Sequence, residues 1–215
     1  MRRSLATIST IFLLALTACV VEPSSGAKPL LPGQAGDANP APTPKRSAHG
    51  GPVFAVGDSL LLGAVEHGGL GVKLAEDGWD LESVAETGRT VRWAIDQVRQ
   101  RDGVPRYVIV VLGSNPGFSS AGFADDVQTL RDALVARGAR VILWIPPHHA
   151  DSSRYDEKVS ILQEADLADR VLVVPDWGKV LEQNPQWIGG DGLHYTEEGY
   201  GAFASFIRDQ LALLG

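Results

Sequence analysis

The chain of 215 residues has a single cysteine, Cys19, so a fold stapled by internal disulfides is excluded. Basic residues are too few for a nucleic-acid-binding surface, because 19 Lys and Arg stand against 26 Asp and Glu and the formal net charge is −7. No internal repeat is visible. The remaining composition, 44% hydrophobic and 21% charged, is ordinary for one globular domain with a sizeable core.

The first 19 residues have the pattern of an export signal rather than of a folded domain. Arg2 and Arg3 precede an apolar stretch, residues 11–18, which is too short for a comfortable transmembrane helix and is typical of a secretory signal. It ends in Leu16-Thr17-Ala18-Cys19, which resembles the lipobox of bacterial lipoproteins. The resemblance implies a signal peptide over 1–18, cleavage before Cys19 and lipidation of Cys19. The alternative is a plain signal peptide with an incidental cysteine.

The segment 19–52 is rich in proline and glycine, with seven Pro and five Gly and no apolar period. This composition cannot bury enough apolar surface to offset chain entropy, so an extended tether is predicted. Loss of Arg2 and Arg3 with the leader changes the net charge from −7 to −9. Attachment to a membrane would therefore depend on acyl chains rather than on charge. The protein is expected to be exported and anchored on the extracytoplasmic side.

Residues 53–215 alternate between short β-rich runs and longer amphipathic stretches. Several of the short runs are continuously apolar, as in strands buried on both faces of a parallel sheet. The pattern predicts an α/β fold, a flavodoxin-like three-layer α/β/α sandwich with a five-stranded parallel sheet. Strands are expected at 53–56, 80–85, 107–113, 140–145 and 170–176, and helices at 60–76, 90–101, 120–137, 154–168 and 196–213.

Ligands of such sheets bind beyond the carboxyl ends of the strands, and polar residues gather there. Ser59 follows the first predicted strand, while Asp191 and His194 stand in the loop before the last predicted helix. A serine hydroxyl needs a base to take its proton and a third group to orient that base. His194 is the candidate base, and Asp191, three residues earlier, is the candidate orienting group.

An attacked carbonyl develops an oxyanion that needs preplaced donors, each commonly worth about 2.7 to 4 kcal/mol. The candidate donors are the N–H groups of Ser59 and Gly88 and the side-chain amide of Asn115. Gly88 has no side chain, so its backbone can approach a substrate closely.

Four segments carry a family resemblance: GDSL at 57–60, TGR at 87–89, GSN at 113–115 and DGLH at 191–194. In order and spacing they resemble the SGNH, or GDSL-type, hydrolase superfamily over residues 53–215. The resemblance implies the SGNH hydrolase fold, Ser59 as nucleophile and Asp191 with His194 as the rest of the triad. It also implies an oxyanion hole of Ser59, Gly88 and Asn115.

The order Ser, Asp, His alone does not exclude an α/β-hydrolase. Position 61, however, is Leu, so GDSL is not the G-x-S-x-G elbow of that class.

A closer resemblance lies in ETGRTVRWAIDQV, VVLGSNPG, VVPDW and DGLHYTEEGYGAFA. These phrases are similar to the SGNH domain that is fused to membrane acyltransferases which O-acylate cell-surface glycans. Two departures stand out. GSNPG lacks the Asp that follows Asn in many esterases of the superfamily, and an Asn expected after strand four has no clear match around Lys158-Val159-Ser160.

Each of these residues also has an alternative interpretation. Gly57-Asp58-Ser59 suits a helix N-terminus, so Ser59 is a capping residue, a nucleophile or both. His148 and His149 with Asp151 suggest a metal site, but no third strong ligand is apparent, so neither metal nor cofactor is expected. Trp187 either stacks on a sugar or packs its loop.

The leading hypothesis is an exported, lipid-anchored serine esterase acting on small, acetyl-like O-acyl esters, with cell-surface glycan as the substrate. Its partners would be an acylated glycan or small ester and, through Cys19, a membrane, with no nucleic acid. The alternatives are an O-acyltransferase to glycan, a lipase or thioesterase, and a non-catalytic glycan-binding module.

Overall fold

A computed structural model describes residues 50–115, 119–168 and 170–215. The predicted signal peptide 1–18, the lipidation site Cys19 and the predicted tether up to residue 49 lie outside the described residues.

The five strands form one parallel sheet, as predicted, with the order β2-β1-β3-β4-β5. This is the flavodoxin-like order: β2 lies on one side of β1, and the later strands are added on the other side, beginning with β3. Asp58, directly after β1, donates its N–H to the carbonyl of Val111 at 3.0 Å, so the exits of β1 and β3 lie side by side. The strands are β1 (Pro52–Gly57), β2 (Asp80–Ala85), β3 (Tyr107–Val111), β4 (Val141–Ile145) and β5 (Leu172–Val173).

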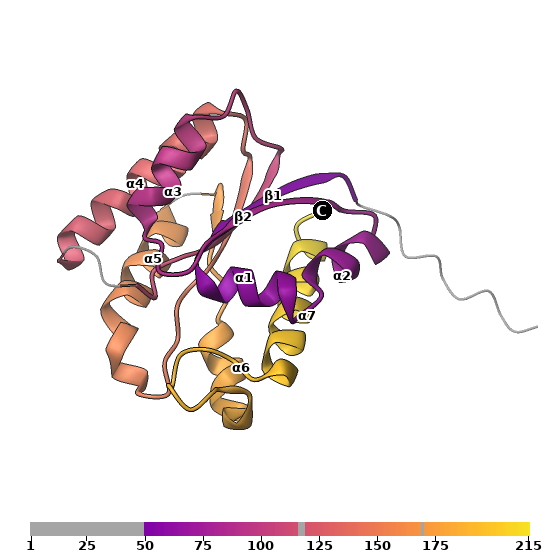
Figure 1. Cartoon of the computed structure of the whole chain (residues 1–215). Coiled ribbons are helices and arrows are strands. Elements are labelled where there is room, and N and C mark those ends of the chain that lie inside the picture. Colours follow the sequence, from indigo (N-terminus) through magenta and orange to yellow (C-terminus); the bar gives the residue numbers. More distant parts are fainter. Residues whose placement is uncertain (1–49, 116–118, 169) are drawn as a thin grey trace, which may run out of the picture. The chain divides into compact units, whose positions relative to one another are not determined.

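Helices cover both faces of the sheet (Figure 1). One face carries α3 (Val91–Arg99), α4 (Ser120–Ala136) and α5 (Asp156–Ala168). The other carries α1 (Ser59–Glu66), α2 (Leu70–Glu76), α6 (Trp177–Gln183) and α7 (Glu197–Ala212). Successive residues of β1 point to opposite faces, so Val53 and Ala55 join one apolar core while Phe54 and Val56 join the other. The predicted three-layer sandwich is confirmed.

Several element boundaries differ from the prediction; the strand expected over 107–113, for example, ends at Val111, and the helix expected over 90–101 spans Val91–Arg99. The helix expected over 60–76 is two helices, α1 and α2, because Gly68 and Gly69 interrupt it and glycine disfavours helix. The fifth strand ends at Val173, because Pro175 has no N–H to donate to a neighbouring strand and Asp176 already caps α6. Helix α5 begins at Asp156, after the 3₁₀ turn η1 (Ser152–Tyr155). A second 3₁₀ turn, η2 (Pro185–Trp187), precedes the loop of Asp191.

Within the described ranges, no helix combines the length and the apolar character needed to cross a bilayer.

Candidate active site

Ser59 is placed by the turn that joins β1 to α1. Asp58 is the N-cap of α1, and its Oδ1 accepts the N–H of Leu60 at 3.0 Å. Ser59 is the first helical residue. The idea that Ser59 itself caps the helix is therefore wrong, because its neighbour already does so. The Ser59 hydroxyl is left free for another partner.

That partner is His194. The Ser59 Oγ lies 2.8 Å from His194 Nε2, and His194 Nδ1 lies 2.6 Å from Asp191 Oδ2. With the ring proton on Nδ1 donated to Asp191, Nε2 is the acceptor that faces the serine hydroxyl. The structure thus brings together three residues that the sequence separates by up to 135 positions.

Asp191 is held ionised by the groups around it. The ring N–H of His194 is the main cause that lowers the pKa of the Asp191 carboxyl, and two backbone N–H groups lower it further. These belong to Leu193 and His194 and donate to Oδ1 at 3.0 and 2.9 Å. A carboxylate fixed in this way holds the imidazole in one orientation and one tautomer.

The loop that carries Asp191 and His194 is fixed by aromatic packing. Trp187 stacks on Trp177 with ring centroids 6.3 Å apart and planes at 10°, so its ring packs the loop against α6. Trp177 Nε1 in turn donates to the buried hydroxyl of Tyr195 at 2.9 Å. The carbonyl of His194 accepts the N–H of Gly189 at 2.6 Å. Of the two interpretations of Trp187, the packing role agrees with these contacts.

Two of the three predicted oxyanion donors are free. Among the described residues, neither the N–H of Ser59 nor that of Gly88 donates a hydrogen bond. The first N–H groups of a helix have no partner within the helix, which explains the free N–H of Ser59. Gly88 has φ of +78°, a backbone conformation that favours glycine. Both groups are available to a substrate.

Asn115 differs, because its amide is already in use. Its Nδ2 donates to the carbonyl of Arg89 at 3.0 Å and to Asp58 Oδ2 at 3.2 Å. An amide has two hydrogens, so a substrate oxyanion would have to replace one of these acceptors. The oxyanion role of Asn115 stays a prediction, and the structure adds that it requires a local exchange of hydrogen bonds.

Asp58 has a role that sequence reasoning missed. Its side chain is 0% exposed, and its Oδ2 accepts the hydroxyl of Ser114 at 2.6 Å. Burial raises the pKa of the Asp58 carboxyl, and hydrogen bonds from Ser114, Leu60 and Asn115 oppose that rise. Asp58 therefore ties the turn of Ser59 to the loop of Asn115. The preference of Asp for N-caps could have indicated the cap, but nothing in the sequence signals the contact with Ser114.

The two histidines after β4 face different surroundings. His149 Nδ1 accepts the backbone N–H of Asp151 at 2.9 Å, and Ala150 donates its N–H to the carbonyl of Gly192 at 2.7 Å. The exit of β4 thus braces the loop of Asp191. Nowhere in the described part of the chain do three His, Cys, Asp or Glu side chains converge in a way that could hold a metal ion.

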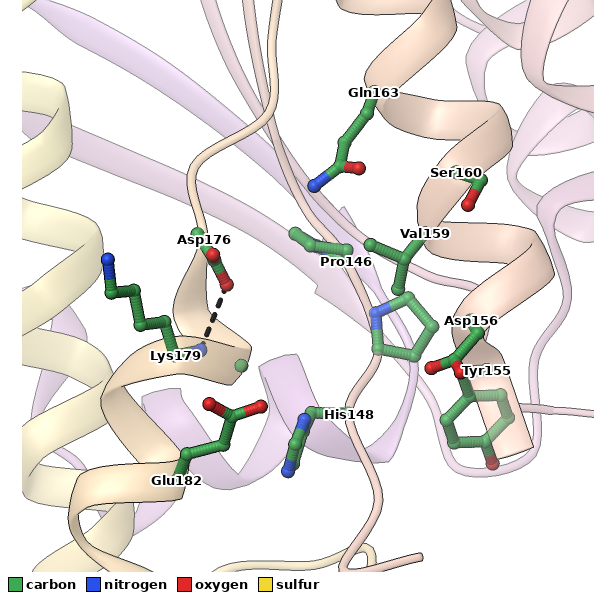
Figure 2. A pocket seen from close by; sticks show the side chains of 12 residues that line it. Pro146, His148, Tyr155, Asp156, Val159, Ser160, Gln163, Asp176, Lys179 and Glu182 are labelled. Atoms are coloured by element: carbon green, nitrogen blue, oxygen red, sulfur yellow. Dashed lines mark hydrogen bonds between the residues drawn. The ribbon is translucent and has the colours of Figure 1, made fainter. Parts of the chain in front are cut away.

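His148 belongs to a polar cleft of about 390 Å³ between α5 and α6, at the exit of β4 (Figure 2). Burial is the main cause that lowers the pKa of the His148 ring. None of the three triad residues lines this cleft. Its walls are Pro146, Pro147, His148, Tyr155, Asp156, Val159, Ser160, Gln163, Asp176, Gly178, Lys179 and Glu182.

The chain matches no protein-family model and no curated protein, but it matches solved structures. One is a protein from Slackia heliotrinireducens assigned as an SGNH hydrolase, with 16% identity and a TM-score of 0.58 over 75% of this chain and 99% of that one. The chain has the SGNH hydrolase fold. It is also similar to the C-terminal catalytic domain of peptidoglycan O-acetyltransferase A from Streptococcus pneumoniae, with 20% identity and a TM-score of 0.61 over 76% and 95% of the two chains.

A family 3 carbohydrate esterase from Clostridium thermocellum has the same fold, with 15% identity and a TM-score of 0.54 over 75% of this chain and 98% of that one. In the SGNH hydrolase fold of this chain, Ser59, Asp191 and His194 lie at the carboxyl edge of the sheet, where ligands of such sheets bind.

Proposed function

We propose that the protein is a serine esterase that removes small, acetyl-like O-acyl groups from cell-surface glycan. The observation that carries the proposal is the hydrogen-bonded chain from Ser59 through His194 to Asp191, with links of 2.8 and 2.6 Å. The glycan substrate draws support from the fold shared with a peptidoglycan O-acetyltransferase domain and a carbohydrate esterase.

Acylation of the enzyme follows from the positions of these groups. Ser59 Oγ attacks the ester carbonyl carbon while its proton passes to His194 Nε2. The carbonyl oxygen becomes an oxyanion that the free N–H groups of Ser59 and Gly88 can stabilise. The C–O bond to the sugar then breaks, and His194 returns its proton to the leaving hydroxyl. The acyl group remains on Ser59 as an ester.

Deacylation uses the same residues with water as the nucleophile. His194 takes a proton from water, the hydroxide attacks the acyl carbon, and Ser59 leaves with the proton from His194. The side chains of His194 and Asp191 are 41% and 55% exposed, so water can reach the site.

The first test replaces the nucleophile. Ser59→Ala should lower kcat on a short-chain aryl ester at least ~10³-fold, because the acyl-enzyme can no longer form. Ser83→Ala, at an exposed position of β2, is the matched control and should keep the wild-type rate. Circular dichroism should show the same fold in all three proteins. Undiminished turnover by Ser59→Ala would overturn the proposal.

The substrate is tested separately. Mass spectrometry of surface glycan from cells with and without the protein should show fewer O-acyl groups when the protein is present. Esters of increasing acyl length should react more slowly than acetyl esters, whereas a lipase or thioesterase would prefer long chains. A non-catalytic glycan-binding module would bind glycan and leave Ser59 unmodified by a serine-directed phosphonate.

O-acyl transfer to glycan is the second candidate, favoured by the similarity to the O-acetyltransferase domain. Both reactions share the acyl-enzyme and differ in whether water or a sugar hydroxyl attacks it. A gain of O-acyl groups on glycan in the presence of the protein would favour transfer.

A further inference from the structure

We infer that Tyr155 and Lys158 are positioning residues that set the loop of residues 113–115, and through it the Asn115 amide, for the reaction at Ser59. The inference rests on the proposed esterase function. Neither residue belongs to the triad or to the predicted oxyanion hole. Both come from the segment η1–α5, which follows β4 and is distant in sequence from the loop it contacts.

The contacts reach three consecutive carbonyl groups. Lys158 Nζ donates to the carbonyl of Gly113 at 2.6 Å and to that of Asn115 at 3.3 Å. The Tyr155 hydroxyl donates to the intervening carbonyl, that of Ser114, at 2.7 Å. Every peptide carbonyl from Gly113 to Asn115 therefore accepts a side-chain hydrogen from one short segment. Such a set of bonds fixes the direction of the loop's peptide planes.

The same loop is held from its other side by Asp58. The Ser114 hydroxyl and the Asn115 amide both donate to Asp58 Oδ2, at 2.6 and 3.2 Å. Asp58 directly precedes Ser59 and caps its helix. The loop thus lies between a buried carboxylate that is tied to the nucleophile and two donors from η1–α5. A shift of Tyr155 or Lys158 would therefore move the Asn115 amide relative to Asp58 and Ser59.

Lys158 is itself fixed by its surroundings. Its Nζ lies 5.3 Å from the ring centroid of Phe123 and 5.5 Å from that of Tyr155, within the range of cation–π attraction. Burial lowers the pKa of the Lys158 ammonium, and the charge of Asp58 opposes that change. Tyr155 is buried, with 6% of its surface exposed. An ammonium held here also adds positive potential behind a loop that is predicted to face an oxyanion.

The first experiment measures kcat and KM on a short-chain aryl ester. Lys158→Met should lower kcat about 10- to 100-fold with KM changed less than about 3-fold, because small misplacements of catalytic groups cost rate rather than binding. Tyr155→Phe removes one hydrogen bond and should lower kcat about 3- to 10-fold. Lys158→Arg keeps charge and donors and should recover part of the loss. Lys73→Met, at a partly exposed position of α2 on the other face of the sheet, is the matched control.

A double-mutant cycle separates positioning from a general loss of stability. If Lys158 and Tyr155 act through Asn115, their substitutions should cost less than about 3-fold in kcat in an Asn115→Ala background. The inference would be overturned if the substitutions lowered kcat by the same factor in the Asn115→Ala background as in wild type. It would also be overturned if Lys158→Met and Tyr155→Phe both kept the wild-type kcat. Should Lys158→Met fail to fold, Tyr155→Phe and Lys158→Arg carry the same cycle.

The outcomes also separate this inference from the proposed function. Wild-type turnover by Ser59→Ala contradicts the esterase itself. Loss of turnover in Ser59→Ala together with undiminished kcat in the Lys158 and Tyr155 variants contradicts the positioning role alone.

Discussion

Asp58 links the helix that begins at Ser59 to the loop that follows β3. It caps α1, accepts the hydroxyl of Ser114 and lies beside Ser59, all with a side chain that is 0% exposed. Ionising a carboxyl group in such a buried place costs free energy, and burial therefore raises the pKa of the Asp58 carboxyl. The residue that caps the helix of Ser59 thus also makes the stability of the fold depend on pH.

The raised pKa of the Asp58 carboxyl makes the fold less stable as pH rises through a defined window. The folded protein holds the Asp58 proton more tightly than the unfolded chain does. Between the ordinary aspartate pKa, about 3.9, and the raised value, the free energy of unfolding therefore falls as pH rises. Asp58→Asn has no titratable group at this position. The free energy of unfolding of wild type minus that of Asp58→Asn should thus decrease as pH rises through the window and level off above it.

Urea unfolding of both proteins at a series of pH values measures this difference. A difference that stays constant with pH, or grows as pH rises, would contradict the raised pKa of Asp58.

At the residue scale, the sequence was informative where chemistry narrows the choice of residue. Ser59, Asp191 and His194 stand in short motifs, and the structure places them within hydrogen-bond distance of one another. Lys158 and Tyr155 could not be found in this way. Their contacts with residues 113–115 depend on how η1 and α5 pack beside the loop that follows β3, and no local pattern encodes that packing.

At the scale of elements, the packing of α1 on α7 depends on one small residue. A Cβ added to Gly63 in α1 would lie 2.2 Å from ring atoms of Tyr200 in α7. Tyr200 is buried, with 7% of its surface exposed, so its ring has little room to move. The absence of a side chain at Gly63 is what allows this close approach.

Gly63→Ala should therefore destabilise the protein by about 1 to 3 kcal/mol, since overpacking forces side chains and backbone to shift. Gly71→Ala is the matched control, because an added Cβ there meets nothing within 4 Å. It should be neutral or stabilising by up to ~1 kcal/mol. Thermal and urea unfolding measure both. Equal stability of the two variants would show that the helices adjust without cost.

The elements that the sequence predicted well are those with long or continuous apolar patterns. The apolar runs located β1, β3 and β4, and helical periodicity located α4 and α7 to within a few residues. Short elements escaped detection. Helix α6 has only seven residues, fewer than two full turns, so its periodicity was too short to detect. It falls in the loop predicted after the strand 170–176.

At the scale of the whole molecule, the order of strands and helices was enough to predict the sheet and the edge that carries the site. Right-handed crossovers leave few ways to arrange five such units. The cleft between α5 and α6 could not be predicted from the sequence, because its walls come from separate segments that meet only in the folded chain.

We propose that the molecule is anchored in a membrane by lipid on Cys19. In a bacterial host that lipidates exported proteins, Cys19→Ala should move the protein from the membrane fraction to the soluble fraction, because two or more acyl chains are needed for durable anchoring. Its turnover of a short ester, per molecule, should match wild type. Immunoblots of the two fractions test this, and a variant that stays with the membrane would contradict lipid anchoring through Cys19.

The direction of β1 has a consequence for the proposed attachment through Cys19. The chain enters β1 at Pro52 and leaves it at Gly57, and Ser59 stands just beyond. A strand of six residues spans about 20 Å, so the upstream polypeptide joins the sheet at the end remote from the nucleophile. The proposed anchor on Cys19 would thus be joined to the domain at the edge of the sheet opposite the one that carries Ser59, so attachment to a membrane would not occupy the edge where a substrate binds.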